Sequence, residues 1–158
     1  MSDEPSNKDD ASPPKTDPRL ARAARSIALL ARVFEQVARD SGVSLPQYRL
    51  LAFLRDGPKR AGELAARAAI KRPTLTALVD TLEKEERLQR IADECDGRGV
   101  QAEITEKGHD DLEAVESALC AVVEELCRLG NYEEMLNMID HLSERVEVEV
   151  ERRLKKVD

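Results

Sequence analysis

The stretch from Lys71 to Arg90, KRPTLTALVDTLEKEERLQR, predicts a helix with an unusual beginning. Its apolar residues recur at helical spacing, which places them on one face and predicts that they lie in the core: Leu75, Leu78, Val79 and Leu82. Pro73 suits the first helical turn, where a missing backbone N–H is no loss. A helix N-terminus carries partial positive charge and is usually capped by Ser, Thr, Asp or Asn, yet Lys71 and Arg72 stand there. Each cation should cost the helix about 0.3–1 kcal/mol, so we expect both to have a role outside it.

The segments before and after this helix have their own periods. PRLARAARSIALLARVFEQVARDSG (18–42) predicts a long helix that stops at Gly42, and LPQYRLLAFLRDGP (45–58) and AGELAARAAI (61–70) predict two shorter helices. VQAEI (100–104) alternates apolar and polar residues, which predicts a strand, and residues 90–104 predict a β-hairpin with glycines at its tip. Two long helices with apolar stripes, over 105–130 and 131–157, close the chain.

This order of elements predicts a mainly α protein, a winged helix-turn-helix with long flanking dimerisation helices and a two-stranded β wing. We expect residues 1–17, rich in acids, Pro and Ser, to form a disordered tail, and residues 46–104 to form the winged domain. Residues 18–45 and 105–158 form the expected dimerisation region. Helices of about 25 residues span about 37 Å, whereas the winged domain has a radius of gyration of about 10 Å. Because a second copy would cover the excess stripes, we expect a homodimer.

The formal net charge of −7 is unevenly distributed. Residues 105–158 contain seven basic and fifteen acidic residues, whereas residues 18–45 contain five Arg and two acids. Between Asp56 and Asp80 five cations accompany a single acid, Glu63: Lys59, Arg60, Arg67, Lys71 and Arg72. Positive charge therefore gathers around the unusual helix start.

Several classes of function find no support in the sequence. It has no apolar run long enough to span a membrane and no secretory signal, so we expect a cytoplasmic protein without a membrane partner. Cys95, Cys120 and Cys127 form no disulfide framework; we expect the last two to be small core residues and Cys95 to be exposed. His109 and His141 are too scattered for a metal site, and no nucleophile or phosphate-loop motif occurs. We expect no catalytic residue, metal, cofactor or enzymatic activity.

Residues 45–108 resemble the core of the MarR family, the multiple-antibiotic-resistance regulators. The resemblance rests on the helix RPTLTALVDTLE (72–83), on Arg90 at the start of the wing, on Asp96-x-Arg98 at its tip and on ITEKG (104–108) after it. With the flanking long helices it extends over residues 18–158. It implies a dimeric, sequence-specific DNA-binding transcriptional regulator, a repressor released by a small molecule, whose partner is double-stranded DNA with an inverted repeat.

Three positions depart from the family's pattern. Lys71 stands where a Ser-like cap is common, and Ala77 stands where a polar or basic residue is common, which implies fewer base contacts. Glu86 occupies the place of the glycine that usually follows the recognition helix. Because a left-handed cap costs more without glycine, we expect the corner between helix and wing to be built differently.

The charged helix start and the resemblance together give the expected site residues. For DNA binding these are Lys71, Arg72, Pro73, Thr74, Thr76 and Ala77 of the recognition helix, with Arg90, Asp96 and Arg98 of the wing. Thr76 can bond a base edge or a phosphate, and Ala77 can contact a thymine methyl group. Arg98 is expected in the minor groove, with Asp96 bracing an arginine. Family members often hold small aromatic or phenolic ligands between the dimer helices and the winged domain, where Tyr48, Arg49 and His109 could line a cleft.

Other interpretations remain open at this level. The polar face of the helix could be merely solvated. A protein-interaction module that has lost DNA binding would carry acids along the groove face, where Asp80 is the only one. An RNA-binding protein would need aromatic side chains for base stacking, and this chain has two Phe, two Tyr and no Trp.

Overall fold

The computed structural model describes residues 16–68, 70–93 and 99–154. The chain forms two compact units, one up to Arg32 and one from Val33 onward. The elements are α1 (Pro18–Asp40), α2 (Leu45–Leu54), β1 (Lys59–Arg60), α3 (Ala61–Ala68), α4 (Arg72–Lys84), β2 (Leu88–Ala92), β3 (Val100–Ile104), α5 (Glu106–Arg128) and α6 (Tyr132–Leu154). The mainly α prediction is confirmed. Residues 1–15 of the expected tail lie outside the described residues, as do Cys95, Asp96 and Arg98.

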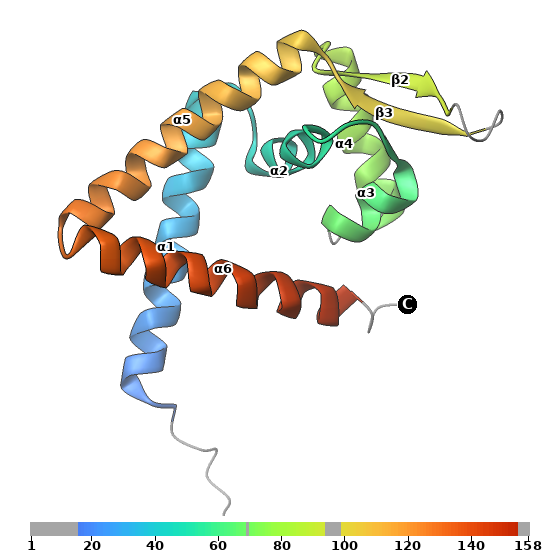
Figure 1. Ribbon diagram of the computed structural model, residues 1–158. Helices are drawn as coiled ribbons and strands as arrows, with labels where there is room; N and C mark the ends of the chain where they lie inside the picture. Colours follow the sequence, from blue (N-terminus) through green and yellow to red (C-terminus); the bar gives the residue numbers. More distant parts are fainter. Residues whose placement is uncertain (1–15, 69, 94–98, 155–158) are drawn as a thin grey trace, which may run out of the picture. The chain divides into compact units, whose positions relative to one another are not determined.

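The wing contains one strand more than predicted. β2 and β3 pair antiparallel, with Leu88 opposite Ile104 and Ala92 opposite Val100. Figure 1 shows β2 and β3 side by side. β1 pairs with the other edge of β3, so the sheet order is β1-β3-β2. A strand of two residues is too short to show an alternating pattern, which is why the sequence did not reveal it.

The core of the second unit lies under α4. Leu75, Val79 and Leu82 are buried and Leu78 is half-buried, as predicted. They pack with buried leucines of α2 and α3, with Leu88 and Ile104 of the wing, and with the first half of α5. α4 therefore has one face packed in the core and the other face exposed.

The corner between α4 and the wing is not built differently from a left-handed cap, contrary to the expectation from the sequence. Glu86 has a φ of 61°, and no other described non-glycine residue has a positive φ. The Arg87 N–H donates to the Leu82 carbonyl at 2.9 Å, and the Thr105 hydroxyl donates to the Glu86 carbonyl at 2.7 Å. The corner thus keeps the left-handed cap, although Glu86 carries a side chain. Hydrogen bonds to the surrounding backbone offset a strain of about 1–2 kcal/mol.

The two long C-terminal helices differ in burial. α5 buries Leu112, Val115 and Leu119, whereas α6 has no buried residue among those whose burial is described. The expectation for the cysteines is half wrong. Cys127 is buried, but Cys120 is exposed because it lies one helical position, about 100°, beyond Leu119.

Candidate nucleic-acid interface

The start of α4 has the geometry that the sequence indicated. Lys71 is the N-cap residue, with φ −68° and ψ 147°, and its side chain makes no capping hydrogen bond. The first helical hydrogen bond runs from the Leu75 N–H to the Lys71 carbonyl at 3.0 Å. Pro73 lies in the first turn. This end of α4 therefore combines an uncapped positive helix terminus with the exposed side chains of Lys71 and Arg72.

The outward face of α4 is small and polar near this end. Pro73, Thr74, Thr76 and Ala77 are all exposed. The Thr76 hydroxyl donates to the Arg72 carbonyl at 3.0 Å, which leaves its lone pairs free to accept a hydrogen bond. A surface without long side chains allows the helix axis to approach another molecule closely.

Arg90 joins the wing to the recognition helix. Its Nη2 donates to Asp80 Oδ1 at 2.5 Å, and its Nη1 donates to Glu83. The bond to Asp80 raises the pKa of Arg90 above its ordinary value. Asp80 was the single acid on the groove face that could have indicated a protein-interaction module. It is paired with Arg90 of the same chain.

A second arginine–carboxylate pair lies toward the tip end of the wing, just after β2. Arg60 of β1 donates through Nε to the buried Asp93, whose N–H donates to the Gly99 carbonyl at 2.9 Å. This pair attaches β1 to the point where the chain leaves β2. The predicted tip residues follow directly, outside the described part of the chain.

Two cations that the site prediction missed surround one aromatic ring. The Lys59 ammonium lies 5.8 Å from the centre of the Phe53 ring, and the Arg67 guanidinium carbon lies 5.6 Å from it. Such cation–π contacts orient long side chains that are otherwise mobile. The charge count between Asp56 and Asp80 was the signal that could have identified them.

The charges of residues 59–84 are unequally paired. The acids have partners, because Glu63 accepts the Arg60 N–H and Arg90 binds Asp80 and Glu83. The described residues offer no ion-pair partner to five cations: Lys59, Arg67, Lys71, Arg72 and Lys84. Within the described part of the chain, these five positive charges are not neutralised by an ion pair, which suits a polyanion.

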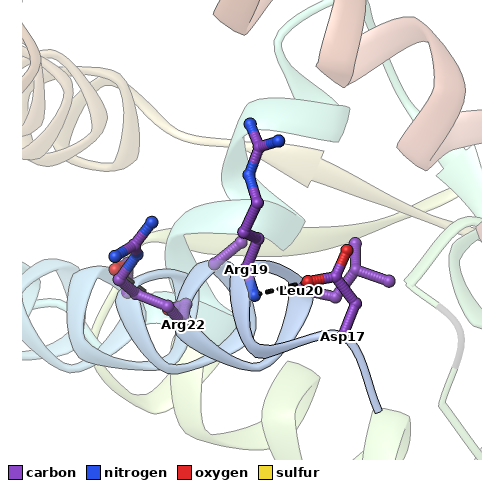
Figure 2. Close-up of a pocket in the computed structure, with 6 residues that line it drawn as sticks. Asp17, Arg19, Leu20 and Arg22 are labelled. Carbon is purple, nitrogen blue, oxygen red and sulfur yellow. Dashed lines mark hydrogen bonds between the residues drawn. The ribbon is translucent and has the colours of Figure 1, made fainter. Parts of the chain in front are cut away.

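Two hollows of the described chain are relevant to ligand binding. One, of about 150 Å³, is lined by α3, α4 and β3 and includes Thr76 and Arg90; this is below the roughly 300 Å³ of the smallest typical ligand pockets. The other lies on α1 alone, where the Arg19 N–H donates to Asp17 at 2.8 Å and Arg22 is nearby (Figure 2). Neither brings together groups that suggest catalysis.

The structure does not bring the three expected ligand residues together in either hollow. Tyr48 of α2 is half-buried, and burial followed by the charge of Glu116 raises its pKa. Glu116 of α5 is also bonded to Arg55. Arg49 is exposed, and His109 is half-buried in the first turn of α5.

Two further searches of the described residues gave negative findings. No group of three or more His, Cys, Asp or Glu side chains is placed to hold a metal ion. None of the described helices is both long and apolar enough to cross a membrane.

Comparison with known proteins agrees with this geometry. The model of the MarR family matches residues 41–99. A transcriptional regulator of Thermotoga maritima, Tm0710, is 31% identical, with 88% of this chain and 99% of that chain covered and a TM-score of 0.57. The chain belongs to the MarR family. It is thus a DNA-binding transcriptional regulator and not an enzyme.

Other MarR-like folds were solved with bound molecules. The structure of NadR in complex with 4-hydroxyphenylacetate is 23% identical, with 84% of this chain and 95% of that chain covered and a TM-score of 0.65. A point mutant of S. aureus MepR, bound to an oligodeoxyribonucleotide, is 21% identical, with 82% and 96% covered and a TM-score of 0.58. These two show likeness of fold to this MarR-family chain. No curated protein sequence matches it.

Proposed function

We propose that this protein is a homodimeric repressor that binds an inverted repeat in double-stranded DNA and is released by a small aromatic or phenolic ligand. Residues 46–104 would bind DNA, and residues 18–45 and 105–158 would form the dimer. The uncapped N-terminus of α4, with Lys71 and Arg72 beside it, is the observation that carries the proposal.

Phosphate fits this helix end for three reasons. The first backbone N–H groups of a helix lack helical acceptors, the helix dipole is positive there, and two side-chain cations add full charges. Beyond it, Thr74, Thr76 and Ala77 would face the bases. In the major groove Thr76 would bond a base edge or a phosphate, and Ala77 would contact a thymine methyl group.

The wing would supply the second contact. Arg90 would lie beside the backbone, oriented by Asp80 and Glu83. We assign Arg98 to the minor groove, where narrow A·T-rich DNA attracts arginine, and Asp96 to bracing an arginine. These two assignments rest on the resemblance of the wing motif.

A dimer is supported by the surface of α6. Its apolar side chains are exposed in the single chain, including Met138 at 64%, Leu142 at 50% and Val146 at 50%. A helix of 23 residues with an exposed apolar stripe gains most of its stability from packing against a partner. A second copy of the chain would provide that surface, and its two-fold symmetry would match an inverted repeat with half-sites about 10–10.5 base pairs apart.

The ligand class is proposed by analogy with NadR, which was solved with a phenolic acid. Tyr48, Arg49 and His109 lie on α2 and on the first turn of α5, which contact each other. An arginine and a histidine could pair with a carboxylate, and a half-buried tyrosine could pack against an aromatic ring.

The salt dependence of DNA binding tests the phosphate site. Replacing both Lys71 and Arg72 by Ala removes up to two phosphate contacts per chain and four per dimer. The slope of log affinity against log salt should flatten by about 3.6 at most, at about 0.9 per contact. The control Arg128→Ala/Arg145→Ala removes the same charge from exposed positions of α5 and α6 and should leave the slope unchanged. An unchanged slope in the Lys71/Arg72 variant would refute the site.

A single substitution adds a second test, in which stability and DNA affinity should change in opposite directions. Lys71→Ser should restore a cap and stabilise the free protein by about 0.5–2 kcal/mol. The same change should weaken DNA binding, because it removes a phosphate contact. Thermal unfolding without DNA and a binding titration measure the two effects, and a cation that serves only solubility would leave affinity unchanged.

A further inference from the structure

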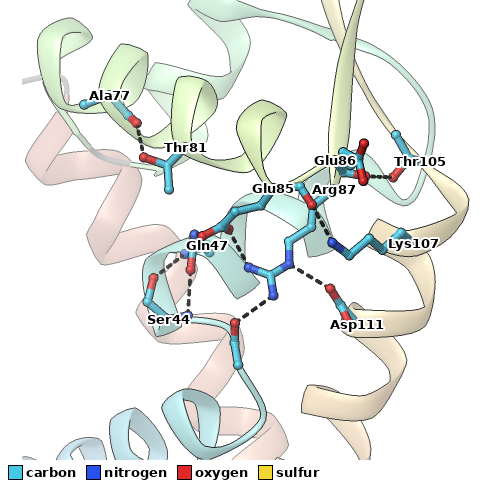
Figure 3. A network of polar contacts seen from close by, with 11 residues as sticks. Ser44, Gln47, Ala77, Thr81, Glu85, Glu86, Arg87, Thr105, Lys107 and Asp111 are labelled. Atoms are coloured by element: carbon cyan, nitrogen blue, oxygen red, sulfur yellow. Dashed lines mark hydrogen bonds and ion pairs between the residues drawn. The ribbon is translucent and has the colours of Figure 1, made fainter.

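Arg87 connects three parts of the second unit through one side chain. It lies between α4 and β2, and its side chain is only 12% exposed. Its Nε donates to Asp111 Oδ2 at 2.7 Å, its Nη1 to Glu85 Oε2 at 2.5 Å and its Nη2 to the Gly42 carbonyl at 2.8 Å (Figure 3). The guanidinium therefore joins the corner before α2, the end of α4 and the body of α5.

The partners of Arg87 are themselves held in place. Glu85 Oε2 also accepts a hydrogen bond from Gln47 Nε2 at 3.0 Å, and Gln47 forms the capping box of α2 with Ser44. The network thereby includes the start of α2 (Figure 3). Every side chain in it is restrained by at least one neighbour from another element or from a helix cap.

The backbone of Arg87 is in close contact with α5 as well. Its carbonyl accepts the Thr105 N–H at 3.1 Å. A Cβ on Gly108 would lie 2.0 Å from this carbonyl oxygen, so the first turn of α5 approaches as closely as a glycine allows. Both the side chain and the backbone of Arg87 thus hold the end of α4 against the start of α5.

The charge of Arg87 is stabilised where it lies. Burial alone would lower the pKa of Arg87, but the bonds to Asp111 and Glu85 outweigh burial and raise it. The planar guanidinium serves three acceptors in three directions, which a lysine ammonium on a flexible stem cannot reproduce. Arg87→Lys therefore removes the geometry of the network while keeping its charge.

Arg87 is far from the DNA-facing end of its helix. α4 has 13 residues, so Arg87 lies about 20 Å along the axis from Lys71. Recognition helices contact base edges through their N-terminal residues. Arg87 itself does not reach that end, so it would affect DNA binding through the positions of α4 and of the adjoining β2 relative to the rest of the chain.

We propose that Arg87 is a positioning residue that holds α4 at a fixed angle to α5 and so sets the half-site spacing that the protein accepts. The inference rests on the proposed function, in which two recognition helices of a dimer contact two half-sites. In such a dimer α5 belongs to the dimerisation region and α4 contacts DNA. A rotation of α4 against α5 that swings it toward or away from the two-fold axis changes the separation of the two α4 helices, and the Arg87 network opposes such a rotation.

The test is a spacing profile. Affinities of the wild-type dimer and of Arg87→Lys are measured on duplexes whose two half-sites are moved apart or together one base pair at a time. We expect the wild type to prefer one spacing, and Arg87→Lys to lose about tenfold in affinity there, because two or more charged hydrogen bonds are lost. At the neighbouring spacings the loss should be much smaller, so that the profile flattens.

Two further variants separate positioning from general loss. Lys71→Ala should lower affinity by one common factor at all spacings, because it removes a contact without freeing α4. Asp111→Asn weakens the same network from α5 and should flatten the profile as Arg87→Lys does; it also serves if Arg87→Lys does not fold. Circular dichroism and sedimentation establish that each variant is folded and of the same size as the wild type.

The outcomes are distinguishable. If Arg87→Lys keeps the spacing preference of the wild type unchanged, the inference is overturned and the proposed function is not, even if overall affinity falls. Where Arg87→Lys does not fold, the same outcome in Asp111→Asn decides. A folded wild-type protein with no preferred spacing would overturn the proposed two-half-site function and the inference with it.

Discussion

The basic residues of the winged domain fall into two groups. Arg60, Arg87 and Arg90 each bond a carboxylate of their own chain and join segments distant in sequence. Lys71 and Arg72 have no such bond among the described residues. Internal pairing orients the first group, and the absence of pairing leaves the second group available for phosphate.

Glu86 has a residue-level consequence for stability. Glu86 has a φ of 61°, so the substitution Glu86→Gly removes backbone strain. Glycine also has more freedom in the unfolded chain, which offsets part of this gain. We expect a net stabilisation of about 1 kcal/mol. The carbonyl that accepts the Thr105 hydroxyl is retained. Urea unfolding measures the change. Lys84→Gly, in the right-handed last turn of α4, is the control and should destabilise; stabilisation by both would contradict the explanation.

At the scale of elements, α5 and α3 offer a matched pair of glycines. Alanine is the better helix former by about 1 kcal/mol, so Gly62→Ala should be neutral or stabilising, since a Cβ there meets no atom within 4 Å. Gly108→Ala should destabilise the protein despite the same propensity, because its Cβ would meet the Arg87 carbonyl oxygen at 2.0 Å. Thermal unfolding of both variants checks this, and equal effects would show that α5 can move away from β2 without cost.

At the scale of the whole molecule, the exposed stripe of α6 predicts the oligomeric state. We expect the wild type to sediment as a dimer at micromolar concentration. Leu142→Glu/Val146→Glu should yield a monomer, because two charges would then lie in the buried surface. Glu144→Lys, on the opposite side of the same helix, is the control and should remain dimeric. A well-folded wild-type monomer at that concentration would contradict the proposed dimer.

All elements except β1, and the buried face of α4, could be predicted from the sequence alone. The spacing of Leu75, Val79 and Leu82 identified the buried side of α4 and thereby its exposed side. The cations at the first turn of α4 and the alternating apolar and polar residues of β3 could be recognised in the sequence in the same way. All of these features depend on neighbours within one or two helical turns or one strand, so a single stretch of sequence contains what is needed to predict them.

Which side chains meet became known only from the folded chain. Arg87 bonds Gly42, 45 positions earlier, and Asp111, 24 positions later, and no local pattern indicates either partner. The left-handed Glu86 likewise depends on Thr105, 19 positions away. Periodicity determines which face a residue lies on, whereas the partner it bonds is determined by how distant segments pack together.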